Sequence, residues 1–248
     1  MKLLTQNSKL KKNPKYNTWG LDIAPHKLSG YNTCKFAGLC AEVCVGEHSG
    51  LNKMPNAKNA KIRKAKMFFE EKNKFLEDLH NDLEKLNVCK DKRKALVRTN
   101  VDSDIPWEKI DPSIYQYDNI TFYDYTKYIN RSLEYVSGDM PKNYHLTYSW
   151  NENSDVRTVN RVLQKGGCIN MVLGLRYKPN DLCKIPKFAQ IGTKKYSVVD
   201  GDLTDERIPE NDGEGKVVVV RAKTRIDLIQ HYTDKGFFVN VKNNKIKV

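Results

Sequence analysis

The stretch Ala95-Leu-Val-Arg-Thr-Asn-Val101 is the first apolar run after the longest amphipathic segment of the chain, and this succession indicates how the protein folds. Apolar residues recur every three or four positions across residues 56–87, which predicts a helix, whereas the apolar run at 95–101 predicts a strand. The pattern extends outward in both directions. Further strands are predicted at 18–25, 120–125, 143–149, 168–175, 196–200 and 216–221, an edge strand at 236–241, and helices at 106–115 and 154–165.

Strands that alternate with helices favour one α/β domain on a parallel sheet. About six parallel strands at this spacing predict an incomplete (β/α) barrel, and a doubly wound open sheet is the alternative. No repeat or low-complexity linker divides the chain. We therefore expect a basic N-terminal arm at 1–17 and a single barrel-like domain at 18–248.

The composition favours a folded, basic protein. Of the 248 residues, 39% are hydrophobic, and 43 Lys and Arg outnumber 30 Asp and Glu, which gives a formal net charge of +13. This surplus suits contact with phosphate, either in nucleic acid or in an anionic small molecule. No apolar run reaches the roughly 18–20 residues of a membrane span. The first residues also lack the apolar core of a signal peptide, so we expect the cytoplasm.

Three of the six cysteines lie just after the predicted first strand, in Tyr31-Asn-Thr-Cys34-Lys-Phe-Ala-Gly-Leu-Cys40-Ala-Glu-Val-Cys44-Val-Gly46. Clustered thiols in a reducing compartment indicate metal ligands or catalytic groups more than disulfides. Three thiolates can hold three irons of a [4Fe–4S] cluster and leave the fourth iron open. Zinc is the alternative metal, with His48 as a fourth ligand.

The other three cysteines are weaker candidates for metal ligands. Cys168 begins a predicted strand and is expected in the core. Cys183 lies in a loop that could fold back towards the site, and Cys89 ends a helix among lysines. We assign none of them to the metal site.

Polar side chains gather where the predicted strands end. In parallel α/β folds these ends meet at one edge, where functional side chains collect. The acidic segment Asp200-Gly-Asp-Leu-Thr-Asp-Glu-Arg207 could bind a hard cation or a cationic substrate, or form a turn with Arg207 paired to a carboxylate. The candidate catalytic residues at these ends are Arg98, Asn100, Asp124, Lys127, Asn151, Asp200 and Asp202.

The order of these motifs resembles a known family. They are Trp19-Gly-Leu21, the three-cysteine loop, Arg98-Thr-Asn-Val-Asp-Ser-Asp104, Phe122-Tyr-Asp-Tyr-Thr-Lys127, Tyr148-Ser-Trp-Asn151 and Val198-Val-Asp-Gly-Asp-Leu-Thr-Asp-Glu-Arg207. Together they resemble the bacteriophage gene-product-eighty-eight family of small, cysteine-bearing proteins. That family is in turn similar to the barrel of the radical S-adenosylmethionine enzymes, which implies a [4Fe–4S] cluster on Cys34, Cys40 and Cys44.

The resemblance leaves the reaction open. The radical enzymes use C-x3-C-x2-C, whereas this loop is C-x5-C-x3-C, and their glycine-rich segment for S-adenosylmethionine is not evident after the second strand. We therefore expect a phage-encoded iron–sulfur protein. The first hypothesis for its activity is a redox or Lewis-acid enzyme, and binding of S-adenosylmethionine is an open question. The alternative is a nucleic-acid-binding accessory protein with a structural cluster or a zinc site.

Overall fold

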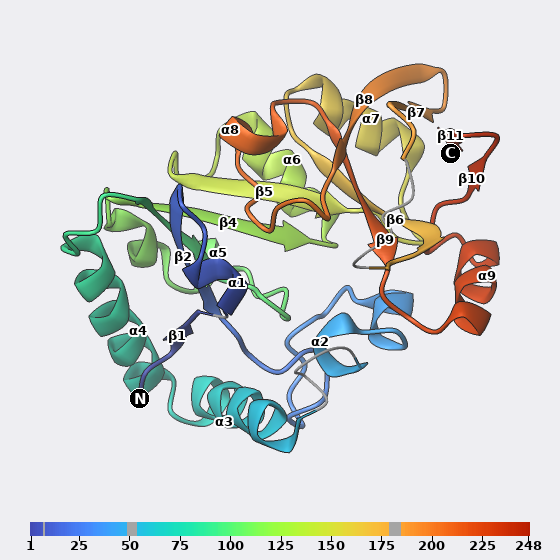
Figure 1. Ribbon diagram of the computed structural model, residues 1–248. Coiled ribbons are helices and arrows are strands. Elements are labelled where there is room, and N and C mark those ends of the chain that lie inside the picture. Colours follow the sequence, from blue (N-terminus) through green and yellow to red (C-terminus); the bar gives the residue numbers. More distant parts are fainter. Residues whose placement is uncertain (7, 49–53, 179–184) are drawn as a thin grey trace. The chain divides into compact units, whose positions relative to one another are not determined.

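The computed structural model describes residues 1–6, 8–48, 54–178 and 185–248 (Figure 1). The chain forms two compact units. Unit 1 comprises residues 1–36, 46–124 and 140–145, and unit 2 comprises residues 37–45, 125–139 and 146–248. The strands β4 (Ile120–Thr126) and β5 (Tyr144–Ser149) and the short helix α2 (Val45–His48) each contain residues of both units.

Unit 1 is built on parallel strands with one antiparallel edge. β2 (Tyr16–Leu21) pairs with β3 (Lys94–Arg98), and β3 pairs with β4, both in parallel. Parallel neighbours need a long crossover, and the helices between β2 and β3 lie in that connection. The predicted arm contains β1 (Leu4–Thr5), which pairs with β2 in antiparallel register. The remaining short helices of unit 1 are α1 (Ser8–Lys11), α5 (Trp107–Ile110) and η3 (Pro112–Gln116).

The amphipathic segment 56–87 forms two helices, α3 (Pro55–Glu70) and α4 (Lys72–Asn87), where the pattern predicted one. Glu71 interrupts them with φ −132° and ψ 48°, which lie outside the helical region. The break lets both helices contribute aromatic rings to one cluster. The rings of Phe68 and Phe75 lie 5.3 and 6.1 Å from that of Trp107.

Unit 2 has a parallel centre and an antiparallel periphery. β5, β6 (Ile169–Arg176), β9 (Val217–Ala222) and β8 (Lys194–Asp200) are neighbours in that order and pair in parallel. β7 (Phe188–Ile191) then pairs with β8 in antiparallel register and with β11 (Lys245–Lys247) in parallel, and β11 pairs with β10 (Val241–Lys242) as a hairpin.

The core of unit 2 lies between its sheet and α7 (Val156–Gln164), whose Val159, Val162 and Leu163 are almost wholly buried with strand residues such as Ile169. Asp155 caps α7 by accepting the backbone N–H of Thr158 at 2.8 Å, so the helix begins at Val156, two residues after the predicted start at 154. The other helices of unit 2 are η1 (Gly38–Ala41), α6 (Ile129–Ser137), α8 (Pro209–Asp212) and α9 (Ile226–Asp234).

The predicted barrel of six parallel strands is wrong. The described residues form eleven strands, and parallel and antiparallel pairs are mixed, so the protein is a mixed α/β structure. The antiparallel pairs that break the parallel pattern are β1–β2, β7–β8 and β10–β11. In β10–β11 the turn residues Asn243 and Asn244 have φ of 50° and 55°, which is the geometry of a tight primed turn.

Candidate functional site

The three clustered cysteines are distributed over both units: Cys34 belongs to unit 1, and Cys40 and Cys44 belong to unit 2. Cys44 is buried, and Cys34 and Cys40 are half-buried. All three are thiols, as are Cys89 and Cys168. Cys183 lies outside the described residues. The described part of the chain shows no group of three His, Cys, Asp or Glu side chains arranged to hold a metal ion.

The Cys34 sulfur is held by backbone groups of unit 1. The N–H of His26 donates to Sγ at 3.3 Å, and Sγ lies 3.5 Å from the carbonyl oxygen of Asp102. Thr33 fixes the same loop, because its hydroxyl donates to the carbonyl of Ala24 at 2.7 Å. The Cys34 side chain is therefore held by one backbone donor and by one backbone acceptor, to which its S–H donates.

A buried lysine lies between two carboxylates, one of which belongs to Asp102, the residue whose carbonyl contacts the Cys34 sulfur. The side chain of Lys61 on α3 is 5% exposed, pairs with Asp102, and lies 3.3 Å from Asp22 Oδ1. Asp22 follows β2 and Asp102 follows β3, so the ends of two parallel neighbours place them together. Burial, and then the charge of Asp102, raise the pKa of Asp22 to about 7 against the opposing effect of Lys61.

Asp22 can therefore hold a proton near neutral pH. Neither Asp22 nor Lys61 was among the site residues predicted from the sequence. Asp22 was placed inside the predicted strand at 18–25, whereas β2 ends at Leu21 and leaves Asp22 just after the strand. The sequence gives no signal for Lys61, because it is one of many lysines in an amphipathic segment. Only the fold distinguishes this buried lysine from the exposed ones.

His48, the candidate zinc ligand, is an exposed residue at the end of α2. Its neighbour Glu47 carries the local contacts instead. Glu47 accepts from His26 Nε2 at 2.7 Å and lies 3.6 Å from Lys58 Nζ. The hydrogen bond between His26 and Glu47 therefore fixes the position of α2, the segment after the cysteine loop.

Asp124, a predicted site residue, is fully buried and accepts several hydrogen bonds within unit 1. Its carboxylate accepts from the hydroxyl of Thr99, from the backbone N–H of Asn100 at 2.6 Å, from Asn100 Nδ2 at 3.0 Å and from the Tyr144 hydroxyl at 3.2 Å. These contacts anchor the loop after β3 to the neighbouring strand.

Asn100 and Arg98 fix the same loop from within. Asn100 Oδ1 accepts from the Ser103 hydroxyl and from the Ile105 N–H, both at 2.8 Å. Arg98 donates to the carbonyls of Asn100 at 3.0 Å and Val101 at 2.8 Å. The structure thus brings together the three predicted residues of unit 1, and their contacts hold the loop that carries Asp102.

In unit 2, Lys127 and Asn151 lie where β4 and β5 end. Lys127 Nζ donates to the Ser149 hydroxyl at 3.1 Å and lies 5.0 Å from the centre of the Phe237 ring. Asn151 Oδ1 accepts the Asn153 N–H at 2.8 Å, and its own N–H donates to Ser154 Oγ at 2.9 Å. Asn151 therefore shapes the turn after β5.

Two carboxylates anchor the cysteine loop within unit 2. Glu152, just after Asn151, accepts the backbone N–H of Leu39 at 2.9 Å through Oε1. Glu42 accepts the Tyr232 hydroxyl of α9 at 2.9 Å. Cys40 lies between these anchors in sequence and packs against the apolar cluster that includes Tyr232 and Phe237. The loop that presents Cys40 is thus fixed at both ends.

Glu152 has a second feature that the sequence did not reveal. Its Oε2 is buried and has no hydrogen-bond partner among the described residues. Gly38 begins η1 with φ +52°, and a Cβ atom there would overlap Glu152 Oε1. The absence of a side chain at Gly38 therefore leaves space for the Glu152 carboxylate, which accepts the Leu39 N–H in the turn that carries Cys40.

Asp200 and Asp202 both form ion pairs with one buried arginine. The Arg221 side chain is 1% exposed; Nη1 and Nη2 contact the two Asp200 oxygens at 2.9 and 3.0 Å, and Nη1 also contacts Asp202 Oδ2 at 2.9 Å. Lys223 Nζ lies 3.6 Å from Asp202 Oδ1. The predicted cation or cationic-substrate site is thus filled by the protein's own guanidinium, which was hidden in the apolar strand β9. The alternative prediction for this segment had Arg207 paired to a carboxylate. In the structure Arg207 Nη1 lies 3.2 Å from the Asp212 carboxylate.

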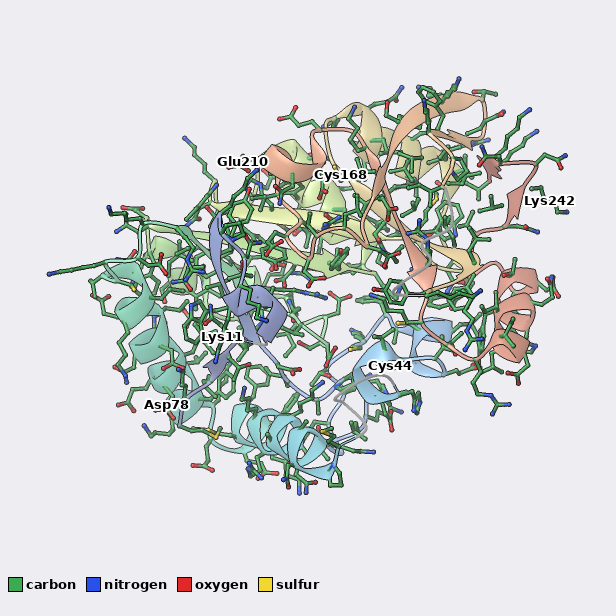
Figure 2. The ribbon with its side chains drawn as sticks, viewed as in Figure 1. Lys11, Cys44, Asp78, Cys168, Glu210 and Lys242 are labelled. Carbon is green, nitrogen blue, oxygen red and sulfur yellow. The ribbon has the colours of Figure 1, made fainter. Side chains whose placement is uncertain are left out.

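Cys168 lies apart from Cys44 within unit 2, as Figure 2 shows. Its thiol donates to the carbonyl of Gly213 at 3.3 Å, and burial raises its pKa. A neutral, internally bonded thiol is a poor metal ligand.

Among the described helices, none combines the length and the apolar character needed to cross a bilayer. No curated protein and no solved structure matches the chain, so the similarity to the radical S-adenosylmethionine enzymes is not supported. One family model, described as Gene product 88, matches residues 1–240, and it confirms the resemblance to the phage family. This match covers nearly all of the 248 residues, and the chain therefore belongs to the Gene product 88 family.

Proposed function

We propose that the protein binds one [4Fe–4S] cluster through the thiolates of Cys34, Cys40 and Cys44. The observation that carries the proposal is the spacing of three thiols within eleven residues, in the pattern C-x5-C-x3-C. A cluster held by three cysteines keeps one iron open, which supplies redox or Lewis-acid chemistry. The proposal therefore extends to an enzymatic activity on a small anionic substrate.

The surroundings of the sulfurs support this assignment within each unit. The His26 N–H donates to Cys34 Sγ, and hydrogen bonds to sulfur are one means by which proteins tune such clusters. Glu152 and Glu42 hold the turn that carries Cys40. Asp22, with its pKa raised to about 7, could hold or release a proton in the unit of Cys34.

Anaerobic purification followed by iron, sulfide and zinc analysis tests the proposal. We expect a brown protein with about four irons and four sulfides per chain. Cys34→Ser, Cys40→Ser and Cys44→Ser should each lose iron and colour, while the matched control Cys89→Ser, at an exposed helix end, should keep both. Circular dichroism checks that each variant is folded. A colourless protein with one zinc, or an iron content that survives all three substitutions, would refute the cluster.

A further inference from the structure

Unit 1 carries two lysine-rich segments that are far apart in sequence. One is the end of α1 and the turn after it, at residues 11–15, and the other is the end of α4 and the connection to β3, at residues 85–94. Their lysines are exposed. The members are Lys11, Lys12, Lys15, Lys85, Lys90, Lys92 and Lys94.

Arg93 connects these two segments through hydrogen bonds. Its Nη1 donates to the carbonyls of Lys11 at 3.3 Å and Asn13 at 3.0 Å. Its Nε and Nη2 contact both oxygens of Asp91, at 2.6 to 3.1 Å, so this carboxylate is neutralised by the arginine. The pairing of β2 with β3 sets Tyr16 opposite Lys94 and fixes the same arrangement.

The lysines of this surface are largely uncompensated. Within the described parts of the chain, the ammonium groups of six of them have no carboxylate at ion-pair distance. These are Lys11, Lys12, Lys15, Lys85, Lys90 and Lys92. Asp82, which lies near Lys85, accepts instead the backbone N–H groups of Leu3 and Leu4 at 2.7 and 3.0 Å. The positive charge of these six lysines is therefore not balanced by a carboxylate at ion-pair distance among the described residues.

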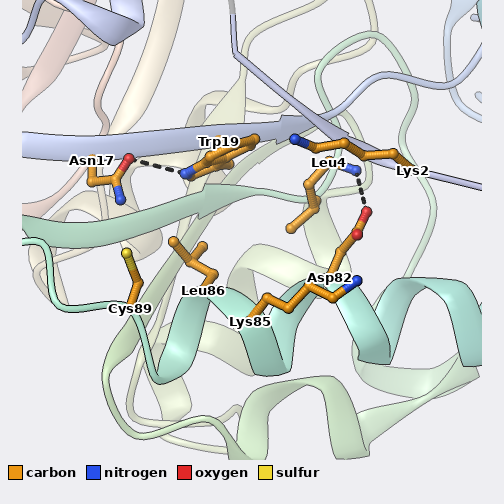
Figure 3. A pocket seen from close by; sticks show the side chains of 8 residues that line it. All are labelled: Lys2, Leu4, Asn17, Trp19, Asp82, Lys85, Leu86 and Cys89. Carbon is orange, nitrogen blue, oxygen red and sulfur yellow. Dashed lines mark hydrogen bonds between the residues drawn. The ribbon is translucent and has the colours of Figure 1, made fainter.

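An apolar hollow adjoins the lysines (Figure 3). Its volume is about 130 Å³, and its lining includes Trp19, Leu86, Cys89, Lys2 and Lys85. Lys2 Nζ lies 4.6 Å from the centre of the Trp19 ring, and the indole N–H donates to Asn17 at 2.9 Å. Lys85 and Cys89 belong both to this hollow and to the second lysine-rich segment, so the two features are continuous.

We propose that this surface binds the phosphate backbone of single-stranded nucleic acid. The lysines are spread over two segments and do not converge on one point, which suits a chain of phosphates better than one small anion. The half-buried indole beside them suits strands whose bases are unpaired, because such sites combine basic grooves with aromatic side chains. This activity goes beyond the proposed cluster and does not require it.

Fluorescence anisotropy with a labelled 20-nucleotide single strand, its duplex and its RNA counterpart tests this assignment. If the six lysines each neutralise one phosphate, the logarithm of the binding constant should fall with the logarithm of salt with a slope of about −4. K11E/K12E/K15E should weaken single-strand binding at least about tenfold and lower the slope by about 2.

The matched control is K242E/K245E/K247E, which makes the same charge change at exposed lysines of β10 and β11. Equal losses in both triple variants would overturn the surface in favour of general charge attraction, as would absence of binding. Tighter binding to the duplex would overturn the single-strand assignment.

Tryptophan emission provides a second readout of the site. Trp107 and Trp150 are 0% and 8% exposed, whereas Trp19 is half-buried beside the lysines. Single-strand binding should quench the emission, and Trp19→Phe should abolish the quenching while keeping the fold. Quenching that persists in Trp19→Phe would place the strand elsewhere.

Discussion

At the scale of single residues, Asp124 is the strongest structural determinant among the predicted site residues. Asp124→Asn keeps the size of the side chain but places an amide against the donors of Thr99, Asn100 and Tyr144. We expect a loss of about 3 kcal/mol in the free energy of unfolding, measured by urea denaturation. The exposed Asp118→Asn is the control and should change it by less than about 0.5 kcal/mol. A loss in Asp124→Asn no larger than the control's would show that the network contributes little.

The same residues show what a sequence can predict about a site. Asp200 is the last residue of β8 and Asn100 lies just after β3, because the alternation of apolar and polar segments marks where strands stop, whereas Asp124 lies inside β4. Their partners could not be predicted. Asp200 is engaged by Arg221, and an arginine in an apolar strand gives no sign of the carboxylates that the fold brings to it.

At the scale of elements, the turn that carries Cys40 depends on glycine. Gly38 and Gly138 both have positive φ, +52° and +83°, but only Gly38 would bring a Cβ atom against another side chain, Glu152. Each Ala substitution should cost about 1 kcal/mol for the backbone, and Gly38→Ala should cost about 1–3 kcal/mol more. Urea denaturation of both variants measures the difference. Equal losses would mean that Glu152 moves away without cost.

Elements were predictable where apolar periodicity is strong. The central strands β3, β4, β6 and β9 were anticipated because parallel, buried strands are continuous apolar runs. The short pairs β7–β8 and β10–β11 changed the fold class and were not anticipated as hairpins. β10 has only two residues and β11 three, so neither displays a period, and their positions depend on turns and partners.

At the scale of the whole molecule, two buried carboxyls govern how stability depends on pH. Burial raises the pKa of Asp22 in unit 1 to about 7 and that of Asp212 in unit 2 to about 6, from 3.8 in each case. A carboxyl whose pKa is higher in the folded state binds its proton more tightly there. Its contribution is therefore complete below about pH 4 and is lost as the pH rises towards the folded pKa.

The free energy of unfolding should consequently fall between pH 4 and 7, by at most about 1.4 kcal/mol per pH unit for each proton. General charge repulsion predicts the opposite, because a protein with a pI near 9.3 loses positive charge as the pH rises. Urea denaturation across this range separates the two effects. The variant D22N/D212N should flatten the profile, and its single substitutions should remove separate parts of the fall, since they lie in different units. A stability that rises from pH 5 to 7, or a fall that persists in the double variant, would mean that these carboxyls are ionised in the folded protein.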